Sequence, residues 1–599
     1  MTAPVTAPLA GLRLAVIGGG LGGIAATLAA ADAGATVTLA AAEPVLGGQV
    51  TAQATSPLDE HPLIESTGAP GSYHEFRRRV RERLGGRTNP GGGWVSRLCF
   101  EPDVGRRVLD DMLAAHVAAG RVRVLLDREP VAARTGIDAA GRHVIEALEL
   151  AGPGGVREVV AADTFVDATE LGDLLPLAGA DWVIGSEGSD AFGEPHALPG
   201  GPDPRAEQSC TWVAGLRLDD VAGPVGPAPH GYAGHVTGQP FGLDIAGWDG
   251  GVHRYAMFRD SVSGNPPFWT YRRVRDAAQL GGRDAVVLNW AGNDYATTGL
   301  VADRERTMRG ARELTLAFVH WLRTEAPRDD GGRGYPEVAL APEITGTPDG
   351  LALAPYVRES RRLASSDPVT EHDIAARDGV ERAVGMRDSL GTAWYHADLH
   401  PRVGHPSSVY APTAPFQVPA RALVPDVGRG PVNLIAGAKN LAATQVAAAA
   451  YRVHPGEWSV GEAAGVLAVE AHAAAIAPAG AASSPGAVRR AQERLLARGT
   501  PLVWARDLPT DHPAFRAATR AVLAGGTTGE RARSLDLRPD DTLVAAERGA
   551  LARAFRLVSP PEGRTWGEAA RAALAASPHP GPSPTPVASA HQHHRQETR

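Results

Sequence analysis

Residues 12–26, LRLAVIGGGLGGIAA, decide the fold class of this chain. The apolar run 12–17 is too short for a helix and suits a buried parallel strand. A glycine-rich turn follows it, and the alanine-rich residues 24–33 have helical composition. Residues 36–40 then alternate between polar and apolar side chains, as a second strand does. The pattern therefore predicts a βαβ unit at the start of an α/β protein.

The glycines of this turn match the spacing GxGxxG, between a predicted strand and a predicted helix. In that context Gly18 permits the tight turn, Gly20 lets the backbone approach a pyrophosphate, and Gly23 lets the helix pack close to the strand. The free N–H groups at the start of the helix would face the phosphates. We therefore expect a dinucleotide here, in contact with Gly18, Gly20, Gly22 and Gly23.

An acidic residue that accepts from a ribose hydroxyl is expected at the end of the second strand, near position 41. Residues 40–42 are all alanine, and Glu43 is the one candidate, about two residues late. Either the loop delivers Glu43 to the ribose, or this contact is missing.

Composition excludes several classes of function. The 59 Lys and Arg residues against 67 Asp and Glu residues give a net charge of −8, so we expect no nucleic-acid partner. The two cysteines, Cys99 and Cys210, are too few for a disulfide framework, a four-cysteine zinc site or an iron–sulfur cluster, and no CxxC pair is present. The N-terminal sequence lacks the features of a signal peptide, and no apolar run reaches the ~18 residues of a membrane span. These observations predict a cytoplasmic protein with no membrane partner.

Lys439 is the single lysine of the chain, and all the other residues counted among its 59 Lys and Arg are arginine. A retained lysine in such a sequence indicates a position that needs a compact ammonium rather than a planar guanidinium.

Several segments resemble known flavoproteins. GGGLGGIAA (18–26), EPVLGGQ (43–49) and FVDATELGDLLPLAGA (165–180) are similar to the glutathione-reductase-like superfamily. More distant segments resemble a group of bacterial FAD-dependent oxidoreductases within it: DEHPLIE (59–65), NPGGGWVSRLC (89–99), NWAGNDY (289–295), YVRESRR (356–362), ADLHP (397–401), NLIAGAKN (433–440) and YRVHPGEWSVGEAAG (451–465). The resemblance covers roughly residues 10–475.

The resemblance implies a Rossmann-like FAD-binding domain assembled from discontinuous segments, with an inserted α+β substrate domain and a helical C-terminal module. The FAD-binding domain would comprise residues 10–55, 104–185 and 410–475, and the substrate domain residues 56–103 and 186–409. The helical module would span 485–575, and the Pro/Ser/His-rich tail 577–599 would be disordered.

The resemblance also implies cofactor contacts beyond the first turn. It places Gly47, Gly48 and Gln49 on the flavin side of the pyrophosphate, and Asp167, Ala168 and Thr169 against the cofactor. Glu170 stands where relatives of the wider superfamily usually have glycine. Gly437 and Asn440, with Lys439, fall where a strand meets the ribityl chain. Gly461 to Gly465 would open a helix whose positive end points at the flavin pyrimidine.

The catalytic candidates begin with the cluster His396, Asp398 and His400, which would share one face of an extended strand. That arrangement is compatible with a metal site, a hydrogen-bonding substrate wall or structural histidines. The resemblance favours Asp398 and His400 as residues that line the site, and we expect no metal.

Five further residues carry candidate roles. His454 could take the proton that accompanies hydride departure, and Arg361 could grip a substrate carboxylate. Lys439, as a fixed cation near the flavin, could favour O2 as electron acceptor. Asn293 is a candidate substrate contact, and His61 either binds near the flavin or tethers it covalently. Each of these residues also has a purely structural alternative.

We expect hydride transfer from a small organic substrate to FAD, because no second strand–GxGxxG–helix unit follows residue 50. One alternative is an FAD monooxygenase or halogenase that a partner reduces. The other is a flavin-binding scaffold without activity, suggested by the alanines at 40–42. The stretch 443–449 also suggests it, since Gln445 and small residues replace a histidine and an asparagine of the group.

Residues 511–555 resemble a degenerate surface-layer-homology-type helical repeat, with an aromatic helix, a glycine turn, an LRPDD strand and a second helix. We interpret this module as a structural appendage or an interaction surface. The sequence indicates neither a substrate nor an oligomeric state.

Overall fold

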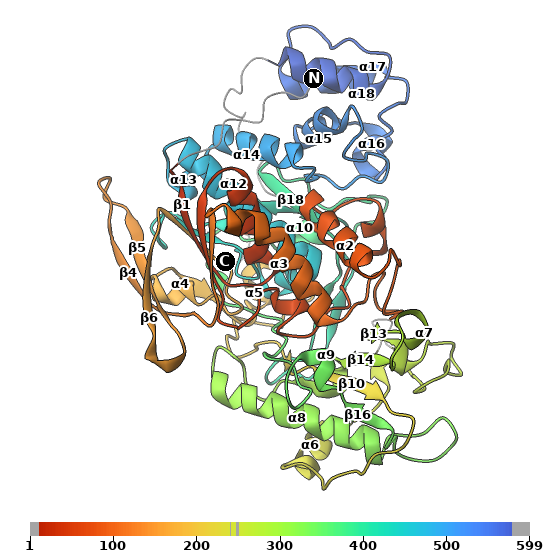
Figure 1. Cartoon of the computed structure of the whole chain (residues 1–599). Helices are drawn as coiled ribbons and strands as arrows, with labels where there is room; N and C mark the ends of the chain where they lie inside the picture. The colour runs from red at the N-terminus through yellow and green to blue at the C-terminus, as the bar shows by residue number, and fades with distance from the viewer. Residues whose placement is uncertain (1–10, 240, 247–250, 578–599) are drawn as a thin grey trace, which may run out of the picture.

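The computed structural model describes residues 11–239, 241–246 and 251–577 (Figure 1). The tail predicted to be disordered lies, beyond its first residue, outside the described residues.

A five-stranded parallel sheet, in the order β22-β7-β1-β2-β3, forms the centre of the molecule. Its strands are β1 (Arg13–Ile17), β2 (Thr36–Ala40), β3 (Val122–Leu125), β7 (Thr164–Asp167) and β22 (Leu434–Ala436). Ile17 pairs with Ala40 on one side and with Asp167 on the other, so these three strands end at one edge. The predicted α/β fold with a Rossmann-like parallel sheet is confirmed.

Two alanine-rich helices pack together beside this sheet, α1 (Leu21–Asp32) and α12 (His454–Ala473). Both are buried over nearly their whole length, as expected for helices that are apolar all round. The helices α2 (Gly71–Arg83) and α3 (Pro102–Ala118) lie nearby (Figure 1).

A three-stranded antiparallel sheet projects from the body of the molecule (Figure 1). It consists of β4 (Glu129–Ile137), β5 (His143–Ala151) and β6 (Arg157–Ala161). The strands follow β3 and precede β7, so the chain leaves the parallel sheet and then returns to it.

A second antiparallel sheet has its own hydrophobic core, formed mainly by residues 210–357. Its strands, in the order β13-β14-β10-β16, are β13 (Arg273–Arg275), β14 (Ala285–Leu288), β10 (Ala214–Leu218) and β16 (Val338–Leu340). The helix α8 (Arg304–Thr324) packs Leu314 and Phe318 into this core. The predicted domain boundaries stay predictions.

Short strand pairs and helices connect the two cores. The pairs are β8 (Trp182–Val183) with β17 (Arg362–Leu363), β9 (Cys210–Thr211) with β15 (Asp294–Tyr295), β11 (Ile245–Ala246) with β12 (Val252–His253), β18 (Ser389–Ala393) with β21 (Phe416–Pro419), and β19 (Ala397–Leu399) with β20 (Val409–Ala411). The helices are α4 (Leu174–Leu177), α5 (Ser189–Phe192), α6 (Tyr232–Gly238), α7 (Ala277–Leu280), α9 (Pro342–Thr345), α10 (Glu371–Ile374) and α11 (Gln445–Tyr451).

The C-terminal part is helical, as predicted. Its helices are α13 (Pro478–Ser483), α14 (Pro485–Ala497), α15 (Phe515–Leu523), α16 (Gly529–Arg533), α17 (Ala545–Phe555) and α18 (Trp566–Ala576). Trp504, between α14 and α15, packs edge-on against Trp394 with ring centroids 5.4 Å apart. Within the described ranges, no helix is both long and apolar enough to cross a membrane.

Candidate functional site

The glycine-rich turn joins β1 to α1 at the carboxyl edge of the parallel sheet. Gly18 has φ +118°, and a Cβ atom there would lie 1.9 Å from the carbonyl oxygen of Ala168. A Cβ atom at Gly23 would lie 1.9 Å from the carbonyl oxygen of Gly18. Only glycine fits at these two positions, which is the reason that the predicted motif requires it.

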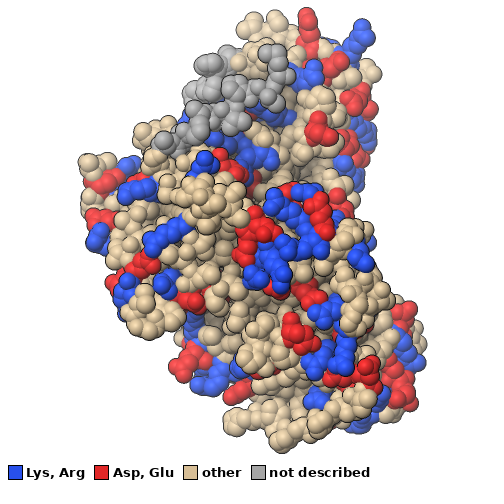
Figure 2. All heavy atoms as spheres, in the orientation of Figure 1, with Lys and Arg blue, Asp and Glu red and all other residues tan. Residues whose placement is uncertain are grey.

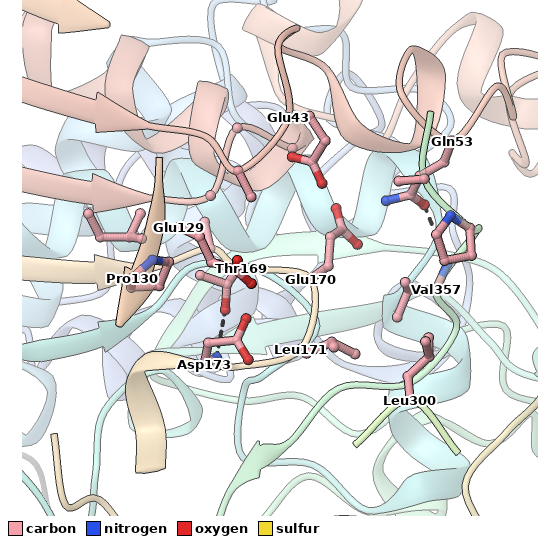
Figure 3. Close-up of a pocket in the computed structure, with 18 of the residues that line it drawn as sticks. Glu43, Gln53, Glu129, Pro130, Thr169, Glu170, Leu171, Asp173, Leu300 and Val357 are labelled. Carbon is pink, nitrogen blue, oxygen red and sulfur yellow. Dashed lines mark hydrogen bonds between the residues drawn. The ribbon is translucent and has the colours of Figure 1, made fainter. Parts of the chain in front are cut away.

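A pocket of about 730 Å³ opens at this edge of the sheet (Figure 3). Gly18 to Gly20 and Glu43 line one side of it, and residues 168–171 line another. Leu300 and Val357, from the part of the chain that forms the second core, line a further side. The carboxyl ends of parallel strands are where open α/β sheets bind nucleotides.

Glu43 reaches this pocket despite its late position in the sequence. Its side chain points toward the carboxylate of Glu170 (Figure 3). Burial, reinforced by the charge of Glu170, raises the pKa of Glu43 to about 7. Glu43 therefore lies at the pocket, and its contact with a ribose stays a prediction.

The segment 47–49 lies against the same turn. The N–H group of Gly47 donates to the carbonyl oxygen of Gly19 at 2.7 Å, and a Cβ atom at Gly48 would lie 2.8 Å from the Cα atom of Gly20. The amide of Gln49 is fully buried and donates to the carbonyl oxygen of Arg452 at 2.9 Å and to the carboxylate of Glu457.

Asp167 lies beneath the pocket rather than in it. Its carboxylate accepts from the N–H and hydroxyl groups of Thr169 and from the N–H group of Leu174. Burial raises the pKa of Asp167 to about 7 in spite of these hydrogen bonds. Ala168 and Thr169 themselves line the pocket.

The residues after β22 lie close to both β7 and the glycine turn. The side chain of Asn440 donates to the carbonyl oxygen of Asp167 at 2.9 Å. A Cβ atom at Gly22 would lie 2.1 Å from the carbonyl oxygen of Gly437. The chain therefore brings these predicted contacts together around one turn, although they are some 400 residues apart in the sequence.

Lys439 is buried in an ion-pair cluster. Its ammonium group pairs with the carboxylate of Glu170 and lies 3.4 Å from a carboxylate oxygen of Glu457. Although burial lowers the pKa of Lys439, these two carboxylates raise it above its usual value, so the amine stays charged. The other carboxylate oxygen of Glu457 accepts from the N–H group of Gly22 at 3.2 Å.

One expectation about α12 is wrong. The helix begins at His454 rather than at Gly461. Pro455 is tolerated in its first turn, because the N–H group that proline lacks would have no partner within the helix at that position. Gly461 and Gly465 lie inside the helix, against the backbone of Gly22 and Ala26 in α1. The unpaired N–H groups of the helix start therefore belong to residues near His454, and the two glycines allow the helices to approach closely.

A second polar cluster surrounds His400. Its Nδ1 atom lies 2.6 Å from Asp294 and its Nε2 atom lies 3.1 Å from Asp398. Arg358 lies 2.9 Å from the other oxygen of Asp294. Burial and the charge of Arg358 lower the pKa of His400, but the two carboxylates outweigh them and raise it above its usual value.

This cluster is deep in the protein, yet part of it is open. The side chains of His400 and Asp398 are 24% and 28% exposed, whereas that of Asp294 is fully buried. Arg452 donates to the carbonyl oxygen of Asp398 at 3.0 Å and to the hydroxyl group of Tyr356 at 2.7 Å. Because Gln49 also binds Arg452, the His400 cluster is joined by hydrogen bonds to the glycine turn.

The structure places four other candidates in well-satisfied surroundings. His454 is fully buried, accepts from the N–H group of Asp59 at 3.0 Å and donates to the carbonyl oxygen of Thr55 at 2.8 Å. Burial lowers the pKa of His454, so the ring is neutral. Asn293 is fully buried, and its side-chain oxygen accepts from the N–H group of Trp290. Its side-chain NH2 group donates to the carbonyl oxygens of Trp212 and Leu288 and to the hydroxyl group of Thr315.

His61 and Arg361 also have protein partners. His61 stacks on Trp394 with ring centroids 3.5 Å apart, and burial lowers its pKa to about 4. Arg361 pairs with Asp173 at 3.0 Å and stacks over Trp182. Their roles toward a substrate or flavin stay predictions. Among the described residues, no group of three or more His, Cys, Asp or Glu side chains is arranged to hold a metal ion.

The site fits an adenine dinucleotide on two observations. The glycine turn has no space for a Cβ atom at Gly18 or Gly23, as the nucleotide-binding motif requires, and the carboxyl group of Glu43 lines the adjoining pocket. A third observation points to a bound donor: the Oε1 atom of Gln49 is buried and has no hydrogen-bond partner among the described residues.

The comparison of the whole sequence with protein families agrees with this geometry. Residues 14–495 match the family described as FAD dependent oxidoreductase. The chain belongs to this family. FAD is its cofactor.

Comparisons with individual proteins are weaker. No curated protein matches the chain. Its fold resembles CabE, an aromatic hydroxylase from angucycline biosynthesis, at 14% identity and a TM-score of 0.21, over 37% of this chain and 40% of CabE. It also resembles the glycerol-3-phosphate dehydrogenase from Bacillus halodurans complexed with FAD, at 13% identity and a TM-score of 0.20, over 35% of this chain and 40% of that enzyme. The chain thus matches less than half of either protein.

Sequence reasoning missed several residues that the structure places in these clusters. Arg452 and Tyr356 link the two clusters, and Glu457 contacts the glycine turn directly. The segment 451–458, YRVHPGEW, carried the signal, because two charged residues and a histidine stand there immediately before an apolar helix. The sequence does not show which way these side chains point, because that depends on the residue at which the helix begins.

Proposed function

We propose that this oxidoreductase transfers hydride from a small organic substrate to FAD and that His400 is its general base. The observation that carries the proposal is the position of the imidazole between a fully buried and a partly exposed carboxylate. Asp294 holds the proton on Nδ1 at 2.6 Å, which fixes the tautomer. Both ring nitrogens face carboxylates, which raise the pKa of His400 and favour its protonated form, so the general base is the neutral ring that forms when Nε2 loses its proton above that raised pKa.

The bound flavin supplies the hydride acceptor. His400 takes the proton that the substrate loses, and Asp398, whose pKa the His400 charge holds well below its usual range although burial raises it, stays ionised beside the ring. Arg452 fixes the backbone of Asp398, so the base and the glycine turn keep a constant separation. The neutral ring of His396, stacked between Tyr395 and Tyr410, forms an aromatic wall next to Asp398.

Lys439 supports O2 as the electron acceptor in this proposal. It is a charged amine beside the nucleotide pocket, and its side chain is only 2% exposed. A fixed cation in a water-poor site stabilises a developing anion.

The remaining parts of the proposal rest on the sequence. They are membership of the glutathione-reductase-like superfamily, a cytoplasmic location, a small-molecule substrate without nucleic acid, and a surface-layer-homology-type C-terminal module. The central parallel sheet supports the first. Acidic and basic side chains mixed over the face in Figure 2 support the absence of a nucleic-acid partner. The helices α15 to α18 are compatible with the module.

The test is anaerobic spectroscopy of the flavin against a panel of metabolites. Reduction by a substrate without NAD(P)H supports hydride transfer, whereas reduction only by an external reductant favours a partner-reduced monooxygenase. His400→Gln should slow flavin reduction by about 10²- to 10⁴-fold. His116→Gln, near the end of α3 where the histidine pairs with Asp32, is the matched control. An unchanged rate in His400→Gln would remove this residue from the chemistry.

A further inference from the structure

The N–H group of Gly22 already has an anionic partner from the protein itself. In a GxGxxG turn the N–H groups at the start of the helix are the donors for the diphosphate. Here Gly22 donates to the Oε1 atom of Glu457 at 3.2 Å. A Cβ atom at Gly20 would lie 2.9 Å from the same oxygen. The Glu457 carboxylate therefore lies directly in front of the turn, at the place that a diphosphate must use.

The charge around this position is unfavourable for a diphosphate. Glu170 and Glu457 share one cation, Lys439, and a third carboxylate, Glu43, faces Glu170 across the pocket (Figure 3). Arg128 and Arg304 also line this pocket, but Glu170 and Glu457 pair with the same single ammonium group, so the carboxylate charge of this cluster exceeds the charge of its cation. A diphosphate would add two more negative charges to a buried space, where like charges repel strongly.

We propose that Glu457 is an internal placeholder for the diphosphate of FAD. On binding, the diphosphate takes the Gly22 N–H group from Glu457, Lys439 exchanges a carboxylate partner for phosphate oxygens, and the pair Glu43 and Glu170 takes up a proton from solvent. This inference rests on FAD as the cofactor, and it makes Glu457 and Lys439 residues that determine the affinity for it.

Two further observations support the exchange. Burial is the main cause that raises the pKa values of Glu43 and Glu170, and the pKa of Glu43 is about 7, so a small change in surroundings protonates Glu43 near neutral pH. Gln49 donates to Glu457 and to Arg452, while its Oε1 atom has no partner in the described structure. The site therefore already holds one anionic group, the carboxylate of Glu457, and it has one acceptor, the Oε1 atom of Gln49, to which a donor group of a ligand would bind.

The neighbouring charged groups leave Glu43 and Glu170 as the groups that titrate. Lys439 stays charged and His454 stays neutral at neutral pH, because the carboxylates raise the pKa of the first and burial lowers that of the second. Arg304 of α8 and Glu129 of β4 act on Glu43, and the side chain of Gln53 hydrogen-bonds to Glu170. Arg128 and Asp173 line the same pocket.

The experiment measures the Kd of FAD for the full chain after the flavin has been removed, between pH 5.5 and 8.5. Because the complex holds more protons than the free protein, affinity should be highest at low pH and should fall as pH rises. Uptake of one proton predicts an increase in Kd of about tenfold per pH unit above the pKa of the free protein. Calorimetry in two buffers with different ionisation enthalpies should report about one proton taken up.

Glu457→Gln keeps the size of the side chain and removes its charge. At pH 8 this variant should bind FAD about tenfold more tightly than the natural chain and should show a weaker pH dependence. Glu462→Gln is the matched control, because Glu462 is a buried residue of the same helix that contacts Ser72, Arg498 and Thr500 instead. Its FAD affinity should not change.

A Kd that is independent of pH in the natural chain, with no proton uptake, would overturn the placeholder proposal whether or not the variant folds. Equal affinities in Glu457→Gln and Glu462→Gln would also overturn it. Both results would leave FAD as the cofactor. Failure of the natural chain to bind FAD at every pH would overturn the proposed function together with this inference.

Discussion

Gly461→Ala tests the contact that holds the phosphate-facing helix start in place. A Cβ atom at Gly461 would lie 2.0 Å from the carbonyl oxygen of Gly22 and 2.5 Å from its carbonyl carbon and Cα atom. Both sides of this contact are backbone, so a rotamer change cannot relieve it, and α1 and α12 must move apart. Overpacking of this kind costs about 3 kcal/mol at the upper end of its usual range.

The free energy of unfolding can be followed by guanidinium titration with tryptophan fluorescence. The matched control is Gly480→Ala, since a Cβ atom at that exposed position of α13 would meet nothing within 4 Å. The control should be neutral or stabilised by up to about 1 kcal/mol, because alanine favours helix. Gly461→Ala should unfold at a clearly lower denaturant concentration and should bind FAD more weakly. Equal midpoints for the two variants would refute the close packing of the two helices at Gly461.

Three other changes test separate parts of the structure. Asp398→Asn removes a carboxylate that raises the pKa of His400, so the pH profile of flavin reduction, active in the neutral form of the base, should move to lower pH; an unmoved profile would contradict the assignment. Lys439→Met leaves two buried carboxylates without their cation and should lower stability by about 3–5 kcal/mol and slow reoxidation of the reduced flavin by O2; reoxidation at the natural rate would reject the oxygen role. Trp504→Ala should cost about 3–5 kcal/mol and expose the C-terminal helices to protease, as measured by limited proteolysis; a natural digestion pattern would show that Trp504 does not hold them.

Residues 11–40 predicted their own structure closely. The pattern predicted a strand at 12–17, a helix at 24–33 and a strand at 36–40, and the structure has them at 13–17, 21–32 and 36–40. The reason is that a buried parallel strand and a helix packed on it need continuous apolar residues, and the turn between them needs glycine at positions that admit no Cβ atom. These requirements are local, so one segment displays them all.

The polar clusters could not be read in the same way. The motif NWAGNDY drew attention to Asn293, but that side chain caps its own turn, and the next residue, Asp294, faces His400. Asn293 ends a 3-10 turn and Asp294 begins the strand β15, so the two neighbouring side chains take different directions that the sequence motif does not reveal. Similarly, the sequence predicted that a helix begins at Gly461, whereas in the structure this helix begins at His454.

By itself, the sequence determined the parallel sheet, the nucleotide turn and the family, since each depends on residue types at fixed short spacings. Only the tertiary structure decided that Glu457 lies on the Gly22 N–H group, that Lys439 joins two carboxylates, and that His400 lies between Asp294 and Asp398. Those contacts join segments up to 435 residues apart. Their direction depends on how the two cores and the helices pack, and packing is a property of the whole chain rather than of any one motif.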